Sequence, residues 1–251
     1  MKDILSFFDE YTLKARFLPA CIAALPLMSI IASYFDWNEF LVANIVVGFL
    51  VGLIVIYLFS LFARSLGRKV ESKILKEWGG FPTTQFLRHR DSTLSSVKKE
   101  KIHELLAQKS EISLPSLSQE NTDPDQADQK YDEAVTWLRN NTRGDEYKIL
   151  LNENIAYGFF RNSLGLKWVA IILCVLILVI LFILFKVHYP YETYGLNEMV
   201  EFSKTIKLAF WLTLGLSIVM PFYWIFFITE KSMRANAEIY AKTLLDLSYK
   251  V

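Results

Sequence analysis

Cysteine and histidine are scarce in this chain, with two and three among 251 residues. Cys21 and Cys174 both lie within apolar stretches, where cysteine usually packs as a small hydrophobic residue. The three histidines, His89, His103 and His188, do not have the spacing of a metal site. The sequence therefore indicates neither a disulfide framework nor a bound metal.

Excess charge of either sign is also missing. Lysine and arginine number 27 against 26 aspartate and glutamate residues, which leaves a net charge of +1. A bulk attraction to nucleic acid or to anionic lipid is therefore not indicated, although local clusters of charge can still matter.

Sequence signatures of catalysis are missing as well. No dinucleotide-binding fingerprint, P-loop or GxSxG element occurs. The tripeptide His89-Arg90-Asp91 matches part of a kinase catalytic loop, but the downstream Asn, the glycine-rich loop and the DFG element are absent. We therefore expect a protein that is not an enzyme and that needs no cofactor.

Charged residues are absent from the central parts of four apolar stretches, at residues 15–34, 40–63, 168–185 and 208–229. With a rise of about 1.5 Å per residue, helices of this length approach the roughly 30 Å hydrocarbon thickness of a bilayer. The sequence predicts a polytopic membrane protein. The lack of intramembrane charge and of an inverted repeat disfavours a coupled transporter. Four helices can hardly enclose a pore, so a channel would have to be a homo-oligomer.

Lysine and arginine concentrate on one side of these predicted spans. The loop after the second span and the C-terminal tail are rich in bases, whereas the two short loops are mainly acidic and aromatic. The positive-inside rule therefore places both termini and the long insert in the cytoplasm. With this orientation, the sequence predicts four parts of the chain. They are an N-terminal part with the first two spans at residues 1–64, a cytoplasmic domain at 65–166, two further spans at 167–229, and a cytoplasmic helix at 230–251.

The insert shows helical periodicity and no alternating strand pattern. The second span is expected to continue in water over residues 65–78, and a further helix is expected near 95–109. Residues 110–125 are rich in Ser, Pro, Asn and Asp and are typical of a loop. We expect an all-α fold with four transmembrane helices and a helical insert between the second and third.

Two more soluble helices and an approach to the third span complete this prediction. Asp123-Pro124 is typical of a helix start, and the helix that follows carries one apolar stripe, made of Ala127, Tyr131, Ala134, Val135 and Leu138. A helix around 145–162 leads into the third span, and residues 230–247 are expected to form an amphipathic helix packed on the insert or on a neighbouring subunit.

Small and polar residues single out the second span as the helix nearest a central axis. Gly48 and Gly52 form a small-xxx-small pattern that lets helix backbones approach closely, and Asn44 is a polar residue of the same segment. The pattern fits either a channel axis or ordinary helix packing within one subunit.

A candidate ligand site follows the second span. Gly79-Gly80 is expected to stop the helix, and Pro82 with Thr83 or Thr84 to begin a new one. The run carries two hydroxyls, two guanidinium groups and one imidazole, from Thr83, Thr84, Arg88, His89 and Arg90. Such groups bind phosphates, but the arginines can equally pair with local acids or lipid headgroups.

Three segments resemble a known family. They are residues 9–19 (DEYTLKARFLP), residues 78–91 (WGGFPTTQFLRHRD) and residues 153–162 (ENIAYGFFRN). Together they look like the four-helix membrane effectors of bacterial defence gene neighbourhoods, and in particular the membrane effector family of the Hailong anti-phage system.

The resemblance implies an oligomeric channel of the bacterial inner membrane, with a tetramer suggested. It also implies a partner nucleotidyltransferase that makes a single-stranded DNA oligomer, which keeps the channel shut. Loss of this DNA or nucleotide ligand during infection would open the channel, depolarise the cell and halt its growth. The family identifies no ligand-binding residue in this chain.

The residues leave one principal alternative open. A non-conducting membrane scaffold, which anchors a cytoplasmic partner protein through the insert, would have the same spans and the same lack of enzyme motifs. A small transporter or lipid-handling enzyme is disfavoured, because neither intramembrane charge nor a nucleophile supports it.

Overall fold

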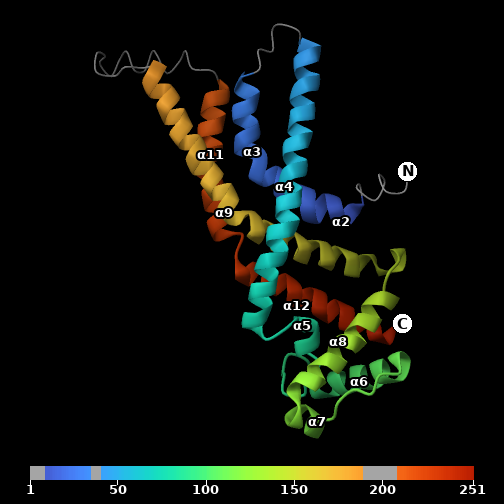
Figure 1. Ribbon diagram of the computed structural model, residues 1–251. Helices are drawn as coiled ribbons and strands as arrows, with labels where there is room; N and C mark the ends of the chain where they lie inside the picture. The colour runs from blue at the N-terminus through green and yellow to red at the C-terminus, as the bar shows by residue number, and fades with distance from the viewer. Residues whose placement is uncertain (1–8, 35–40, 189–207) are drawn as a thin grey trace. The chain divides into compact units, whose positions relative to one another are not determined.

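The computed structural model describes residues 9–34, 41–188 and 208–251 (Figure 1). Every regular element in these ranges is helical, which agrees with the predicted all-α class. The chain divides into two compact units. One comprises residues 1–69 and 161–229, and the other comprises residues 70–160 and 230–251. The boundaries predicted from the sequence, at 64/65 and 166/167, separate residues in the membrane from residues in water. They are a different kind of boundary from that between the two compact units, and they stay a prediction.

Among the residues that the structure describes, four helices are long and apolar enough to cross a membrane. The first unit holds α2 (Glu10–Thr12), a π-helical turn (Leu13–Phe17) and α3 (Leu18–Tyr34), together with α11 (Leu208–Phe226). It also holds most of the apolar lengths of α4 (Leu41–Trp78) and α9 (Lys148–His188). Helix α4 includes the predicted soluble extension 65–78, and the helix expected around 145–162 is the beginning of α9.

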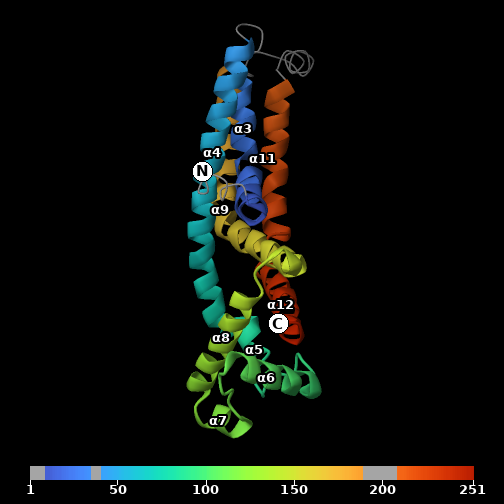
Figure 2. The same cartoon turned by 90° about the vertical axis from the view of Figure 1, so that its right-hand side faces the viewer.

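The interior of the first unit joins three of these helices. Ile30 of α3 packs with Ile177 and Leu181 of α9, and Phe210 of α11 lies against them. Helices α3 and α11 run side by side in both views (Figure 1, Figure 2). Outside this interior, large apolar side chains of α4, α9 and α11 are exposed, among them Phe49, Phe182 and Phe222. Such a surface is suited to lipid or to another copy of the chain.

Helices α4 and α9 cross where both carry glycine. A Cβ atom on Gly165 would lie 2.7 Å from the Cα of Gly67, and it would collide with the backbone nitrogen of that residue as well. Gly52 is buried, and a Cβ there would meet the end of the Met28 side chain. Gly52 therefore contributes to packing within the chain, and Gly48 is half-buried. The backbone of Asn44 belongs to α4, whereas its side chain lies outside the described part.

Proline removes a backbone donor at the start of α3, and a side chain replaces it. In an α-helix the carbonyl of Ala15 would accept from residue 19, which here is Pro19 and has no N–H. The Nδ2 of Asn162, a fully buried residue of α9, donates to the Ala15 oxygen at 2.6 Å. The π-helical turn at Leu13–Phe17 lies at this point. Proline and asparagine together thus shape the base of the first span.

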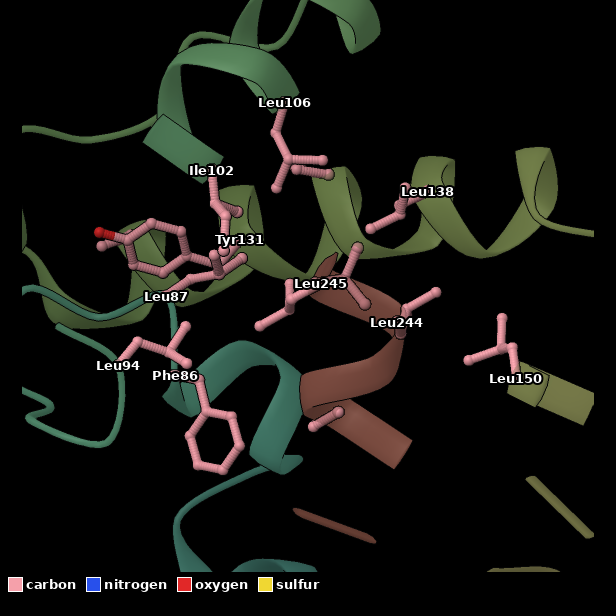
Figure 3. Close-up of a cluster of buried hydrophobic side chains, with 14 residues drawn as sticks. Phe86, Leu87, Leu94, Ile102, Leu106, Tyr131, Leu138, Leu150, Leu244 and Leu245 are labelled. Atoms are coloured by element: carbon pink, nitrogen blue, oxygen red, sulfur yellow. The ribbon is translucent and has the colours of Figure 1, made fainter. Parts of the chain in front are cut away.

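The second unit is a helical domain with its own core. It contains α5 (Pro82–Gln85), α6 (Ser96–Ser110), α7 (Leu117–Thr122), α8 (Pro124–Asn141), a 3-10 turn (Asp145–Tyr147), α12 (Glu230–Asp246) and a last 3-10 turn (Leu247–Tyr249). All five residues of the apolar stripe predicted on α8 are buried in its core. Side chains of α6 approach α8 from one side and leucines of α12 from the other (Figure 3). The C-terminal helix therefore packs on the insert.

Two local predictions for this domain were wrong. Residues 110–125 are not entirely loop, because α7 lies within them. Its start is a capping box, in which the Ser116 hydroxyl accepts from the Gln119 backbone and the Gln119 side chain accepts from the Ser116 N–H. Neither Thr83 nor Thr84 caps α5: Phe81 is the N-cap residue and Pro82 takes the first helical position, where a missing N–H costs nothing.

The glycine crossing predicts a strong effect of one methyl group. Gly165→Ala should lower the free energy of unfolding by about 1–3 kcal/mol, because the new Cβ meets backbone that cannot rotate away. Gly215→Ala is the matched control, since a Cβ on this glycine of α11 meets nothing within 4 Å. Thermal unfolding of the detergent-solubilised protein measures both, and equal midpoints for the two variants would contradict the close crossing.

Candidate ligand-binding site

The backbone that carries the predicted ligand residues is set by two glycines. Gly79 and Gly80 have φ angles of 78° and 116°, in the region that favours glycine, and the N–H of Gly80 donates to the Leu75 carbonyl at 2.8 Å. They end α4 as expected. The chain then forms α5 and a turn that runs over residues 86–95 into α6.

Arg88 is held by the protein itself. Its Nε and Nη2 donate to the two carboxylate oxygens of Asp128 at 2.8 and 2.6 Å, and Nη2 also donates to the Gly79 carbonyl at 2.6 Å. The side chain is 12% exposed. Such a two-pronged pair fixes both orientation and distance. Pairing with a local acid, one of the two alternatives for this arginine, is the arrangement seen.

The two threonines of the predicted set are buried in the same region. The Thr84 hydroxyl donates to Asp132 at 3.4 Å, and Thr83 is 7% exposed. His89 and Arg90, in contrast, have exposed side chains. The structure therefore separates the predicted residues into an inner group of Thr83, Thr84 and Arg88 and an outer pair of His89 and Arg90.

One buried carboxylate organises the turn around the outer pair. Glu120 of α7 accepts from the backbone N–H groups of His89 at 2.7 Å and of Arg90 at 3.4 Å, and from the Tyr131 hydroxyl at 2.8 Å. Burial by itself would raise the pKa of Glu120, but these donors together hold its pKa below the usual value. Burial and the bond to Glu120 raise the pKa of Tyr131. Glu120 is thus ionised and Tyr131 is protonated at neutral pH.

A pocket of about 580 Å³ opens beside this turn, at the beginning of α6. This volume lies within the roughly 300–1,000 Å³ of small-molecule sites. Its wall is formed by the turn and by the first two turns of α6, and polar residues line it together with one leucine: His89, Asp91, Ser92, Leu94, Ser95, Ser96, Lys99, Glu100 and His103.

Lys99 forms the buried wall of this pocket. Its side chain donates to the Arg88 carbonyl at 2.5 Å and also to the Asp91 carbonyl, and the residue is 5% exposed. Burial lowers the pKa of Lys99, although the charges of Asp91 and Glu120 oppose this effect. The ammonium has three N–H groups, of which two serve these carbonyls.

Two histidines meet in the pocket. The rings of His89 and His103 pack edge to face with centroids 5.1 Å apart, and the Nε2 atoms lie 3.0 and 2.7 Å from the carbonyls of Pro115 and Leu87. Since a carbonyl only accepts, each Nε2 carries the proton. Burial lowers the pKa of His103 more than its bond to Leu87 raises it. His103 is therefore a neutral donor at physiological pH.

The sequence analysis missed Lys99, His103 and Glu120. Helical spacing could have placed Lys99 and His103 on one face of α6, because they are four residues apart. The signal for Glu120 was the Ser-x-x-Gln pattern at Ser116, which predicts a helix start. No local pattern could have brought His89 next to α6, because that contact depends on the turn held by Glu120.

The pocket combines two kinds of recognition. The first N–H groups of α6, before the Lys98 N–H that the Ser95 hydroxyl caps, and the serine hydroxyls are suited to a phosphate. The carboxylates of Asp91 and Glu100 are suited to hydroxyl or amino groups. A nucleotide presents both kinds of group. Within the described ranges no cluster of His, Cys, Asp and Glu side chains could hold a metal ion.

The two arginines should respond differently to removal. Arg88→Ala should lower the local stability of the second unit by about 2 kcal/mol, because a paired and partly buried carboxylate loses its partner. Arg90 is 54% exposed and lies 4.0 Å from Glu120, so Arg90→Ala should cost less than about 0.5 kcal/mol. Hydrogen exchange of the α8 amides measures both, and equal effects would be inconsistent with this assignment.

His103 should make the second unit sensitive to acid. Its pKa is lowered in the folded protein, so the unfolded chain takes up a proton first as the pH falls below 6.5. The stability contributed by neutral His103 is complete above pH 6.5 and is lost as the pH falls toward the lowered pKa. His103→Gln keeps an N–H donor for Leu87 but does not titrate, and it should flatten the pH dependence of the unfolding midpoint. An unchanged profile would rule out His103 as the source.

Comparison of the chain with models of protein families, with curated proteins and with solved structures finds no match.

Proposed function

We propose that this chain is an anti-phage effector of the bacterial inner membrane, an oligomeric ion channel whose opening depolarises the cell. In this proposal a nucleotide or a single-stranded DNA oligomer, made by a partner nucleotidyltransferase, binds the cytoplasmic helical unit and gates the channel. The observation that carries the ligand part is the pocket beside α6, in the second unit of a chain that also has four apolar helices in its described part.

The polar groups of the spans support a channel made of several copies. Ser60 and Thr213 are buried and donate to carbonyls of their own helices, Tyr57 and Ala209. The outward faces of the described spans are apolar instead. The described part of one copy therefore offers no polar surface that could line a pore. A pore formed between several copies would have apolar walls, and it would close by a hydrophobic constriction.

The contents of the pocket support a nucleotide-like ligand. The start of α6 and the serines would hold a phosphate, and Glu100 would accept from the nucleoside. In the second unit the buried residues Glu120 and Lys99 hold the turn in place before any ligand arrives. Such a preorganised wall reduces the entropy lost on binding.

A charge placed at the mouth of the pocket tests this function. Ser96 lines the pocket and is exposed, so Ser96→Glu should repel a phosphate and weaken the effect of the ligand on ion flux at least about tenfold. Val97 is 76% exposed and does not line the pocket, so Val97→Glu is the matched control. Both glutamates enter the first turn of α6, where a negative charge is favourable.

The measurement is ion flux from liposomes that contain the purified protein, with and without a single-stranded oligodeoxynucleotide or ATP. Flux that changes with either probe in the Val97→Glu protein, but not in Ser96→Glu, is the expected result. No flux under any condition would overturn the channel. A monomer in detergent that captures one stoichiometric partner would then favour the membrane scaffold.

A further inference from the structure

The end of α4 is held by side chains from the segment that leads to the pocket. A helix leaves its last carbonyl groups without partners inside the helix. Here the Nε2 of Gln85 donates to the carbonyls of Trp78 and Gly80, each at 2.7 Å. Nη2 of Arg88 donates to the carbonyl of Gly79, between these two, at 2.6 Å. Three successive carbonyls at the end of α4 therefore depend on two residues that follow the helix.

Gln85 is fixed in this position. The residue is buried, and both N–H groups of its amide are used by the two carbonyls. Its own backbone carbonyl accepts from the N–H of Arg88 at 3.0 Å, where α5 ends. A buried amide that lost its acceptors would be left unsatisfied, which is costly. The end of α4, α5 and the turn at Arg88 are thus held together.

Lys99 joins this assembly to the pocket. It lines the pocket, and its ammonium donates to the backbone carbonyls of Arg88 and Asp91. Its third N–H has no acceptor among the residues that the structure describes. A phosphate oxygen at the start of α6 would be a strong acceptor for it. A ligand in the pocket can therefore act on Arg88 through a single side chain.

The same end of α4 also holds the beginning of α12. The indole Nε1 of Trp78 donates to Glu230 at 3.1 Å, and the guanidinium of Arg234 lies over the indole, 5.3 Å from the ring centroid. Trp78 is the last residue of α4, and Glu230, the first residue of α12, comes shortly after the end of α11. This contact thus joins the segments that continue from the second and the fourth apolar helices.

We propose that the end of α4 couples the pocket to the second and fourth apolar helices, with Gln85 and Arg88 as positioning residues. The inference rests on the function proposed above, because it needs a phosphate-bearing ligand in the pocket. The phosphate takes the third N–H of Lys99 and restrains the turn at Arg88. Gln85 and Arg88 pass this restraint to the end of α4, and Trp78 passes it to Glu230. Hydrogen bonds between rigid elements can carry such a coupling, and restraint by itself changes an equilibrium.

Hydrogen exchange of the full-length protein in detergent, with and without ATP, tests the coupling. ATP should slow exchange at the start of α6 and also, by at least about fivefold, at residues 75–81 around the end of α4. Gln85→Met keeps the length of the side chain but removes both donors. In this variant ATP should still protect the start of α6, whereas its protection of residues 75–81 should fall below about twofold.

Trp78→Phe is a second variant, which leaves Gln85 in place. It removes the donor to Glu230 but keeps an aromatic ring beneath Arg234. In this variant the protection by ATP should still reach residues 75–81, but it should no longer reach the first turn of α12.

Gln129→Met is the matched control, because Gln129 is an exposed glutamine of α8. ATP should protect this variant in the same regions as the unmodified protein. Equal protection of residues 75–81 in Gln85→Met and Gln129→Met, or protection of α6 alone in the unmodified protein, would overturn the coupling and leave the nucleotide site. No protection by ATP in any region would overturn the ligand part of the proposed function, and the coupling with it.

Discussion

The first unit contains apolar helices long enough to cross a membrane, and in hydrocarbon every backbone N–H and C=O group must find its partner within the protein. Pro19 breaks this rule for the carbonyl of Ala15, and Asn162 repairs it. Asn162 also lies against α4, where a Cβ on Gly67 would come within 2.7 Å of its Oδ1. Arg161, the neighbour of Asn162, donates to the Tyr11 hydroxyl at 3.3 Å.

The second unit satisfies its buried polar groups in a similar way, but around a carboxylate. Glu120 joins α7, the turn at His89 and α8 through three donors, and Lys99 joins the same turn to α6. These two residues fix the wall of the pocket. The ion pair between Arg88 and Asp128 of α8 also fixes the turn to that helix. The groups that would contact a ligand, His89 and the serines of α6, are therefore the ones that the packing leaves at the surface.

Patterns that repeat along one helix were predicted well. The four apolar stretches, the stripe on α8 and the helix start at Pro124 all follow from spacing within a single element. Shorter signals were less successful. The polar composition around Ser116 concealed a two-turn helix, and Pro82 began α5 without the threonine cap that was expected. For the candidate site, the sequence identified His89 and its turn, but it gave Arg88 the same weight as Arg90, although one is held by Asp128 and the other faces solvent.

By itself, the sequence determined the helical class and the four apolar stretches, because hydropathy and periodicity are properties of neighbouring residues. Only the tertiary structure decided which polar groups meet. His89 of the turn reaches His103 of α6, and Arg161 of α9 reaches Tyr11 of α2, through contacts between different elements. Such contacts depend on where glycine permits a close approach and where a buried donor needs an acceptor. These conditions are set jointly by several elements, and no single stretch of sequence contains them.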